Sequence, residues 1–146
     1  MEFNEMWPTK IGAGKFDTNG LIEYIFANYD LNNMEGEVNG GNIFKDNSPE
    51  MNKFKDMVYS SFDRYLYASI GKHIKDYKSH DMKAWITGHG KDYNMTIHNH
   101  SGAHLSGVFY ILAEDQNSSF TYHHVNPYYS SLRICVPVDL YLYRGG

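Results

Sequence analysis

The residues best suited to chemistry are two histidines, His98 and His100, which are separated by one asparagine. Successive side chains of a β-strand point to opposite faces, so residues at i and i+2 of a strand share a face. Two imidazoles on one face can bind a transition metal and leave its other positions open. The spacing therefore predicts a metal site, with both histidines near the end of a strand over residues 93–100.

The segment after this pair predicts the wall that holds it in place. Ser101 and Gly102 have the composition of a turn, and the apolar run Leu105–Leu112 is typical of a strand. Period-two patterns elsewhere after residue 79 predict more strands, at Lys83–Thr87, Ser119–His124, Leu132–Val136 and Val138–Tyr143. The second half of the chain is therefore expected to be a mostly antiparallel sheet or partial barrel.

The first half of the chain has helical spacing instead. Asp17 or Thr18 can cap a helix over about residues 19–29, and Ser48 followed by Pro49 can cap a second helix that runs to about Tyr77. The second helix carries an apolar stripe that must be buried, most simply against the sheet: Phe54, Val58, Phe62 and Leu66. Helices followed by strands predict an α+β domain over residues 1–146, helical up to about residue 79 and β-rich from about residue 80.

Composition excludes several classes of function. The chain has 146 residues, of which 42% are hydrophobic, enough for one domain with its own core. The net charge of −4 and the absence of a Lys/Arg run argue against nucleic-acid binding. A single cysteine, Cys135, excludes a disulfide within the chain. Without an apolar leader or a run of about 20 apolar residues, we expect a cytoplasmic protein with no membrane partner.

Four segments follow one another around the histidine pair: Trp85-Ile86-Thr87, Gly90-Lys91-Asp92-Tyr93, His98-Asn99-His100 and Leu105-Ser106-Gly107-Val108-Phe109-Tyr110. Together they resemble a family of 2-oxoglutarate/Fe(II)-dependent oxygenases found in bacteria, marine phages and their hosts. The pattern of that family is a Trp, a Gly-containing turn, His-x-His, and then Leu-Ser-Gly-Val-Tyr-Tyr. The opening Met6-Trp7-Pro8-Thr9 is also similar to the family's Phe-Pro-Thr.

This resemblance implies a double-stranded β-helix, or jelly-roll, core of the cupin-like type, here incomplete at the C-terminus. It also implies Fe(II) and 2-oxoglutarate as cofactors and the hydroxylation of an unknown substrate. His98 matches the first iron ligand, and His100 stands where better-known relatives have the carboxylate of His-x-Asp. The family's distal His and the cation that binds 2-oxoglutarate have no counterpart, so we expect a C-terminally truncated domain with weak metal binding and no turnover of 2-oxoglutarate.

Four more residues are candidates for the same site. His124, or its neighbour His123, is a candidate third metal ligand, although a place on a sheet face is the favoured interpretation of both. Tyr93 and Arg133 are candidates for contacting the cosubstrate, against the alternative that both are ordinary strand or turn residues. We expect His104, in the turn after the pair, to be structural.

Two other functions fit the same residues. A cupin-like metal-binding protein would combine the pair with His104 or His124 and would not use 2-oxoglutarate. The Glu that usually follows His-x-His in cupins is missing, since the next glutamate is Glu114. A non-catalytic jelly-roll module for binding or structure is the third interpretation. The partner would be a small-molecule or protein substrate, and an exposed sheet edge would favour a homodimer.

Overall fold

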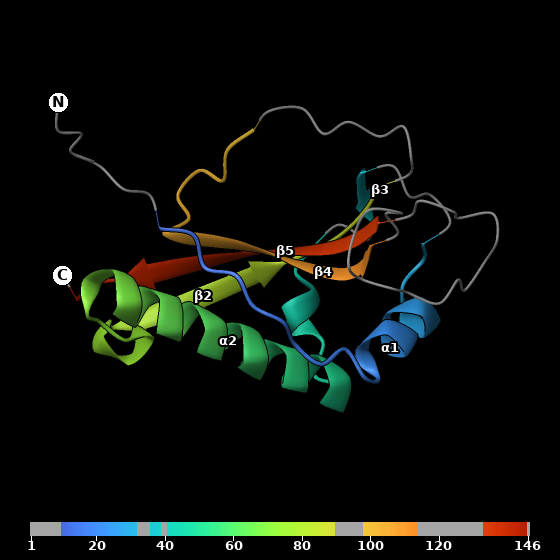
Figure 1. Cartoon of the computed structure of the whole chain (residues 1–146), viewed down its shortest axis with the longest axis horizontal. Coiled ribbons are helices and arrows are strands. Elements are labelled where there is room, and N and C mark those ends of the chain that lie inside the picture. Colours follow the sequence, from blue (N-terminus) through green and yellow to red (C-terminus); the bar gives the residue numbers. More distant parts are fainter. Residues whose placement is uncertain (1–9, 32–35, 39–40, 90–97, 114–132, 146) are drawn as a thin grey trace, which may run out of the picture.

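The computed structural model describes residues 10–31, 36–38, 41–89, 98–113 and 133–145. Helix α2 (Pro49–Ile70) lies along one face of an antiparallel sheet, and α1 (Leu21–Asn28) lies near the N-terminal end of α2 (Figure 1). The strands are β1 (Gly36–Val38), β2 (Ser79–Ala84), β3 (Ile86–His89), β4 (Leu105–Ala113) and β5 (Arg133–Tyr143). Two short 3-10 helices, η1 (Ile43–Lys45) and η2 (Ile74–Asp76), flank α2.

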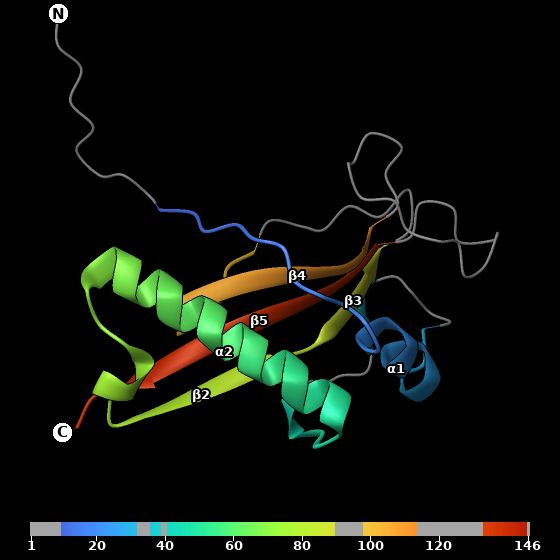
Figure 2. The same ribbon diagram turned by 60° about the horizontal axis from the view of Figure 1, so that its bottom comes forward.

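Strand β5 is the centre of the sheet. Strand β4 pairs with one side of it, and β2 and then β3 pair with the other side. Strand β1 continues the sheet beyond β3. Figure 2 shows α2 crossing in front of β4, β5 and β2. The mixed class of helices and antiparallel sheet predicted from the sequence is confirmed, and the described sheet is open.

Helix α2 begins where the sequence predicts. The Ser48 hydroxyl accepts a hydrogen bond from the Met51 N–H at 3.2 Å, and Pro49 occupies the first turn, where its missing N–H costs nothing. The apolar stripe is buried in the core as predicted, and its buried residues are Met51, Phe54, Val58, Phe62 and Leu66. The predicted end near Tyr77 is wrong. Gly71 has a φ of 69° and ends the helix in the left-handed conformation that glycine adopts without strain.

The first helix is confirmed over Leu21–Asn28, but its predicted cap is wrong. The N-cap residue is Gly20, with no side-chain hydrogen bond to the helix. Asp17 instead accepts the N–H of Asn19 at 2.9 Å, and the carbonyl of Thr18 accepts the N–H of Leu21 at 3.0 Å. A backbone turn thus replaces the expected side-chain cap.

Two predictions about strands are corrected at Pro137 and Trp85. The predicted strands Leu132–Val136 and Val138–Tyr143 are one strand, β5, which passes through Pro137. The predicted strand Lys83–Thr87 is instead divided at Trp85 into the end of β2 and the start of β3. The Pro137 carbonyl accepts the Trp85 N–H at 3.3 Å. Pro137 therefore lies at the point of β5 where its partner changes from β2 to β3, and the missing N–H of a proline is tolerated there.

Alternation along β5 separates the two faces of the sheet. Val136, Val138 and Leu140 point to the core beneath α2, and they are fully buried. Asp139 and Tyr141 point to the opposite face, called the outer face below. The predicted strand Ser119–His124 lies outside the described residues.

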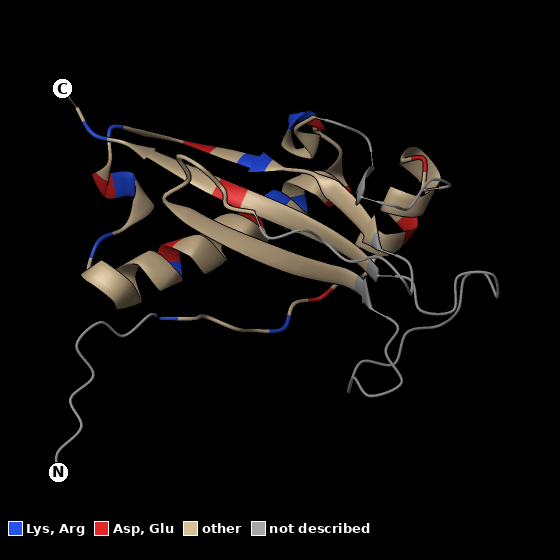
Figure 3. Cartoon of the chain, turned by 90° about the horizontal axis from the view of Figure 1, so that it is seen from above, with Lys and Arg blue, Asp and Glu red and all other residues tan. Residues whose placement is uncertain are grey.

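Acidic and basic residues are scattered over the described elements and form no stripe of one sign (Figure 3). Within the described ranges, no helix has both the length and the apolar character that crossing a bilayer requires.

Candidate metal centre

His98 and His100 lie in a segment without regular secondary structure that leads into β4. The prediction that the pair ends a strand is therefore wrong for residues 98–100, and residues 93–97 lie outside the described part. The two rings nonetheless lie together, as predicted. Their Nε2 atoms are 3.3 Å apart, and their planes are inclined by 29°. The two rings are brought together by the turn that follows His100 and by the buried carboxylate of Asp139, and not by the alternation of side chains along a strand.

The turn after the pair fixes this segment on the sheet. The Ala103 N–H donates to the His100 carbonyl at 3.2 Å, and Gly102 has a φ of 83°, which a turn of this kind requires of its third residue. The His104 N–H donates to the Leu140 carbonyl at 2.9 Å, and His104 Nδ1 accepts the Leu142 N–H at 3.1 Å. His104 therefore anchors the segment to β5, which confirms its structural role.

Asp139 is the central residue of the candidate site, and it is a residue that sequence reasoning missed. It lies on β5, faces the outer side of the sheet and is 5% exposed. One of its carboxylate oxygens, Oδ1, is 2.7 Å from both His100 Nδ1 and Ser106 Oγ. A signal was present, since Asp139 is the one charged residue in the apolar run from 134 to 142, and a buried carboxylate requires a partner.

These contacts determine what His100 can offer. A carboxylate only accepts hydrogen bonds, so the proton in the contact between His100 and Asp139 lies on His100 Nδ1. The lone pair of the neutral ring is then on Nε2, on the side of His98. The Trp85 ring stacks near His100, with centroids 5.6 Å apart and planes inclined by 29°. Asp139 therefore holds the Nδ1 side of the His100 ring, Trp85 stacks over one face of it, and Nε2 is directed at His98.

The geometry fits a metal ion between the two histidines. With metal–nitrogen bonds of about 2.0–2.1 Å, a separation of 3.3 Å corresponds to an N–metal–N angle of about 105–110°. That angle suits tetrahedral coordination, and the right angle of an octahedral site needs the nitrogens to approach by about 0.3–0.5 Å. Neutral imidazole suits Fe, Zn, Cu and Ni. His98 and His100 could therefore hold such an ion.

The described residues supply two candidate ligands and no third. Among them, no group of three or more His, Cys, Asp or Glu side chains is arranged to hold a metal. Asp139 is turned towards Nδ1 of His100, behind the ring, so it does not complete a triad of two histidines and one carboxylate. Any further ligand would come from water or from outside the described part.

The remaining predicted site residues are not brought to the pair by the described structure. Tyr93, His123 and His124 lie outside the described residues. Arg133 is the first residue of β5, where its backbone pairs with Ala113 of β4 and His89 of β3. The participation of these residues in the site stays a prediction.

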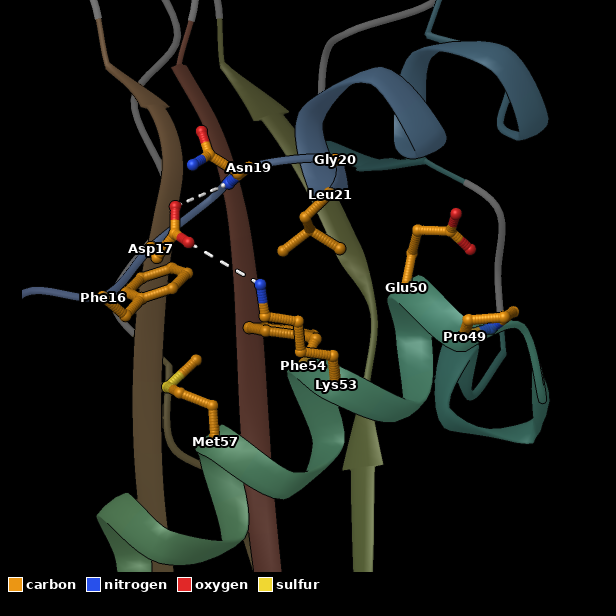
Figure 4. Close-up of a pocket in the computed structure, with 10 residues that line it drawn as sticks. All are labelled: Phe16, Asp17, Asn19, Gly20, Leu21, Pro49, Glu50, Lys53, Phe54 and Met57. Carbon is orange, nitrogen blue, oxygen red and sulfur yellow. Dashed lines mark hydrogen bonds and ion pairs between the residues drawn. The ribbon is translucent and has the colours of Figure 1, made fainter.

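Apart from the histidine pair, a hollow lies between the N-terminal part of α2 and the segment before α1 (Figure 4). Phe16, Leu21, Phe54 and Met57 form its apolar part. Lys53 Nζ and Asp17 Oδ2 are 3.6 Å apart, and both side chains are more than half exposed, so their ion pair is weak. No histidine or cysteine lines this hollow, and we assign no chemistry to it.

Comparisons with known proteins identify no relative. No protein-family model matches the chain, and no curated protein and no solved structure matches it. The functional argument therefore depends on the site itself and on the motifs around it.

Proposed function

We propose that this chain is an Fe(II)-binding domain of the 2-oxoglutarate/Fe(II)-dependent oxygenase type, in which His98 and His100 bind the metal. The observation that carries the proposal is the convergence of His98 Nε2 and His100 Nε2 at 3.3 Å. The resemblance of the flanking motifs to this family supports iron over other metals that imidazole binds. In such enzymes, bound Fe(II) and 2-oxoglutarate supply the oxidising chemistry for hydroxylation.

The chain's own residues would supply part of the coordination of the metal in a fixed orientation. Asp139 orients the His100 ring, and the Trp85 ring stacks on one face of that ring. Both proposed ligands are neutral imidazoles, so neither carries a negative charge that would offset the positive charge of Fe(II). Compared with a site that contains a carboxylate ligand, we expect weaker binding and open coordination positions.

Metal binding is tested by anaerobic calorimetry with Fe(II) and with Mn(II) as an oxygen-stable substitute. We expect one site per chain. We expect His98→Ala and His100→Ala each to weaken binding by more than the roughly 10–100-fold that loss of a supporting hydrogen bond costs. His80→Ala, which changes a histidine on β2 beside Tyr59 and outside this pair, is the matched control and should bind as the wild type does. Metal binding that survives both substitutions at the pair would contradict the proposal.

A separate measurement tests the oxygenase part. Fe(II)-dependent release of succinate from 2-oxoglutarate, lost in His100→Ala, would support an active oxygenase and direct attention to His124 and Arg133. Metal binding without succinate release is our expectation for this chain. Metal binding whose affinity 2-oxoglutarate leaves unchanged would instead support the cupin-like alternative, a metal-binding protein that does not use 2-oxoglutarate.

A further inference from the structure

Asp139 has a position that packing alone does not explain. It is a buried carboxylate on the central strand, flanked in register by Ser106 of β4 and Lys83 of β2. The Lys83 ammonium lies 5.2 Å from the centre of the Tyr141 ring, and it is not the group that bonds Asp139. The groups that do are the Ser106 hydroxyl and the His100 ring. A carboxylate at a buried strand position is costly unless it is satisfied in this way.

The contact with His100 selects one of two ring forms. A free neutral histidine favours the form with its proton on Nε2, which places the proton where a metal would bind. The acceptor at Nδ1 favours the opposite form, with the lone pair on Nε2. A carboxylate behind a histidine ligand both fixes the orientation of the ring and raises its basicity.

The pair of histidines has a consequence for the metal-free state. Since Nε2 of His100 holds a lone pair, the contact of 3.3 Å between the rings requires the proton on Nε2 of His98. A metal ion must displace this hydrogen bond, and His98 must release its Nε2 proton or hold it on Nδ1. The two histidines are therefore not equivalent: His100 is prepared for metal by Asp139, and His98 adapts when the metal arrives.

We propose that Asp139 is the positioning residue of the metal site, holding His100 in the tautomer and orientation that bind the metal, with the Ser106 hydroxyl holding Asp139. This inference rests on the proposed metal-binding function. The Asp139 carboxylate acts through His100 and does not touch the metal.

The chain contains a matched control for this arrangement. Asp63 Oδ2 is 2.7 Å from His73 Nδ1 near the end of α2, which repeats the distance between Asp139 and His100. Asp63 also accepts the Ile74 N–H at 2.7 Å. A substitution at Asp63 therefore removes a similar carboxylate–histidine contact at a place with no part in the metal site.

The test compares Asp139→Ala, Asp139→Asn and Asp63→Asn with the wild type in two measurements. In the metal-free protein, ¹⁵N shifts of the histidine rings report which nitrogen carries the proton. We expect His100 to carry it on Nδ1 in the wild type and in Asp63→Asn, and largely on Nε2 in Asp139→Ala. Calorimetry with Mn(II) should show binding weakened by about 10–100-fold in Asp139→Ala and unchanged in Asp63→Asn.

The conservative variant keeps the test decisive if Asp139→Ala does not fold. Asp139→Asn keeps an acceptor oxygen and loses the charge, so we expect His100 to keep its tautomer and Mn(II) binding to be partly restored. Wild-type affinity in Asp139→Ala, an unchanged His100 tautomer there, or a His100 proton on Nε2 in Asp139→Asn would overturn the inference. If the wild type binds no Mn(II), the proposed function fails, and the tautomer measurement alone then decides whether Asp139 positions His100.

Discussion

At the scale of single residues, Asp46 shows how one carboxylate can join segments that are distant in sequence. Its Oδ2 atom accepts hydrogen bonds from the hydroxyls of Tyr24 and Tyr29 at 2.5 and 3.2 Å, and its Oδ1 atom accepts the Ser48 N–H at 2.8 Å. The Tyr24 hydroxyl, followed by the Ser48 N–H, holds the pKa of Asp46 below its ordinary value. Burial, followed by the charge of Asp46, raises the pKa of Tyr29 to about 12.

These shifts predict how stability depends on pH. Because the pKa of Asp46 is lowered in the folded state, its contribution is complete above the unfolded value of about 3.9 and is lost as the pH falls through the folded value. We expect Asp46→Asn to reduce the free energy of unfolding by about 1–3 kcal/mol near neutral pH. Denaturant unfolding at a series of pH values checks this, because the difference from wild type should shrink as the solution becomes strongly acidic.

The control for this prediction is Asp56→Asn, at an exposed position of α2. A substitution at such a surface position should change stability by less than about 0.5 kcal/mol. A difference between wild type and Asp46→Asn that stays constant into strong acid would contradict the argument.

The candidate site was predictable from the sequence only as far as its spacing showed. The type and separation of His98 and His100 correctly placed the two rings together, although the strand that was expected to align them is absent at residues 98–100. Asp139 is 39 residues from His100 in the chain, and only the pairing of β4 with β5 brings its carboxylate to Nδ1 of the ring. Long-range register of this kind is not contained in a local pattern.

At the scale of secondary-structure elements, the ends were harder to predict than the interiors. The apolar periodicity of α2 continues past its last residue, Ile70, so the pattern alone favoured an end near Tyr77. The backbone instead turns at Gly71, where the N–H donates to the Tyr67 carbonyl at 2.8 Å. The division of β2 from β3 at Trp85 was likewise hidden, because it depends on the position of Pro137 in another strand.

The end of α2 gives a prediction about backbone conformation. A Cβ atom at Gly71 would meet no atom within 4 Å, so a substitution there is opposed by the positive φ of 69° and not by a clash. We expect Gly71→Ala to lower the free energy of unfolding by about 1–2 kcal/mol. Gly14→Ala is the matched control, because Gly14 has equal space and no positive φ, and it should be neutral or slightly stabilising. Equal effects of the two substitutions in thermal unfolding would show that the conformation of Gly71 costs nothing.

At the scale of the whole molecule, strand β5 joins the candidate metal centre to the core. Asp139 bonds His100 on the outer face of β5, while Val138 and Leu140 on either side are buried beneath α2. The segment from His98 to His104 is fixed to the same strand by the two hydrogen bonds of His104. An ion bound by the histidines would therefore be linked to the folding of the sheet, since the site exists only when β5 is in place.

This linkage predicts that metal stabilises the entire domain. A ligand that binds only the folded state adds about 2.7 kcal/mol at a free concentration 100 times its dissociation constant. For a domain near this size, each kcal/mol raises the midpoint of thermal unfolding by roughly 2–4 °C, so Mn(II) should raise the midpoint by about 5–11 °C. The increase should be absent in His98→Ala and His100→Ala and retained in Asp63→Asn, whose midpoint without metal should itself be lower. A midpoint that rises equally in all four proteins would place the stabilising metal elsewhere and separate the histidine pair from it.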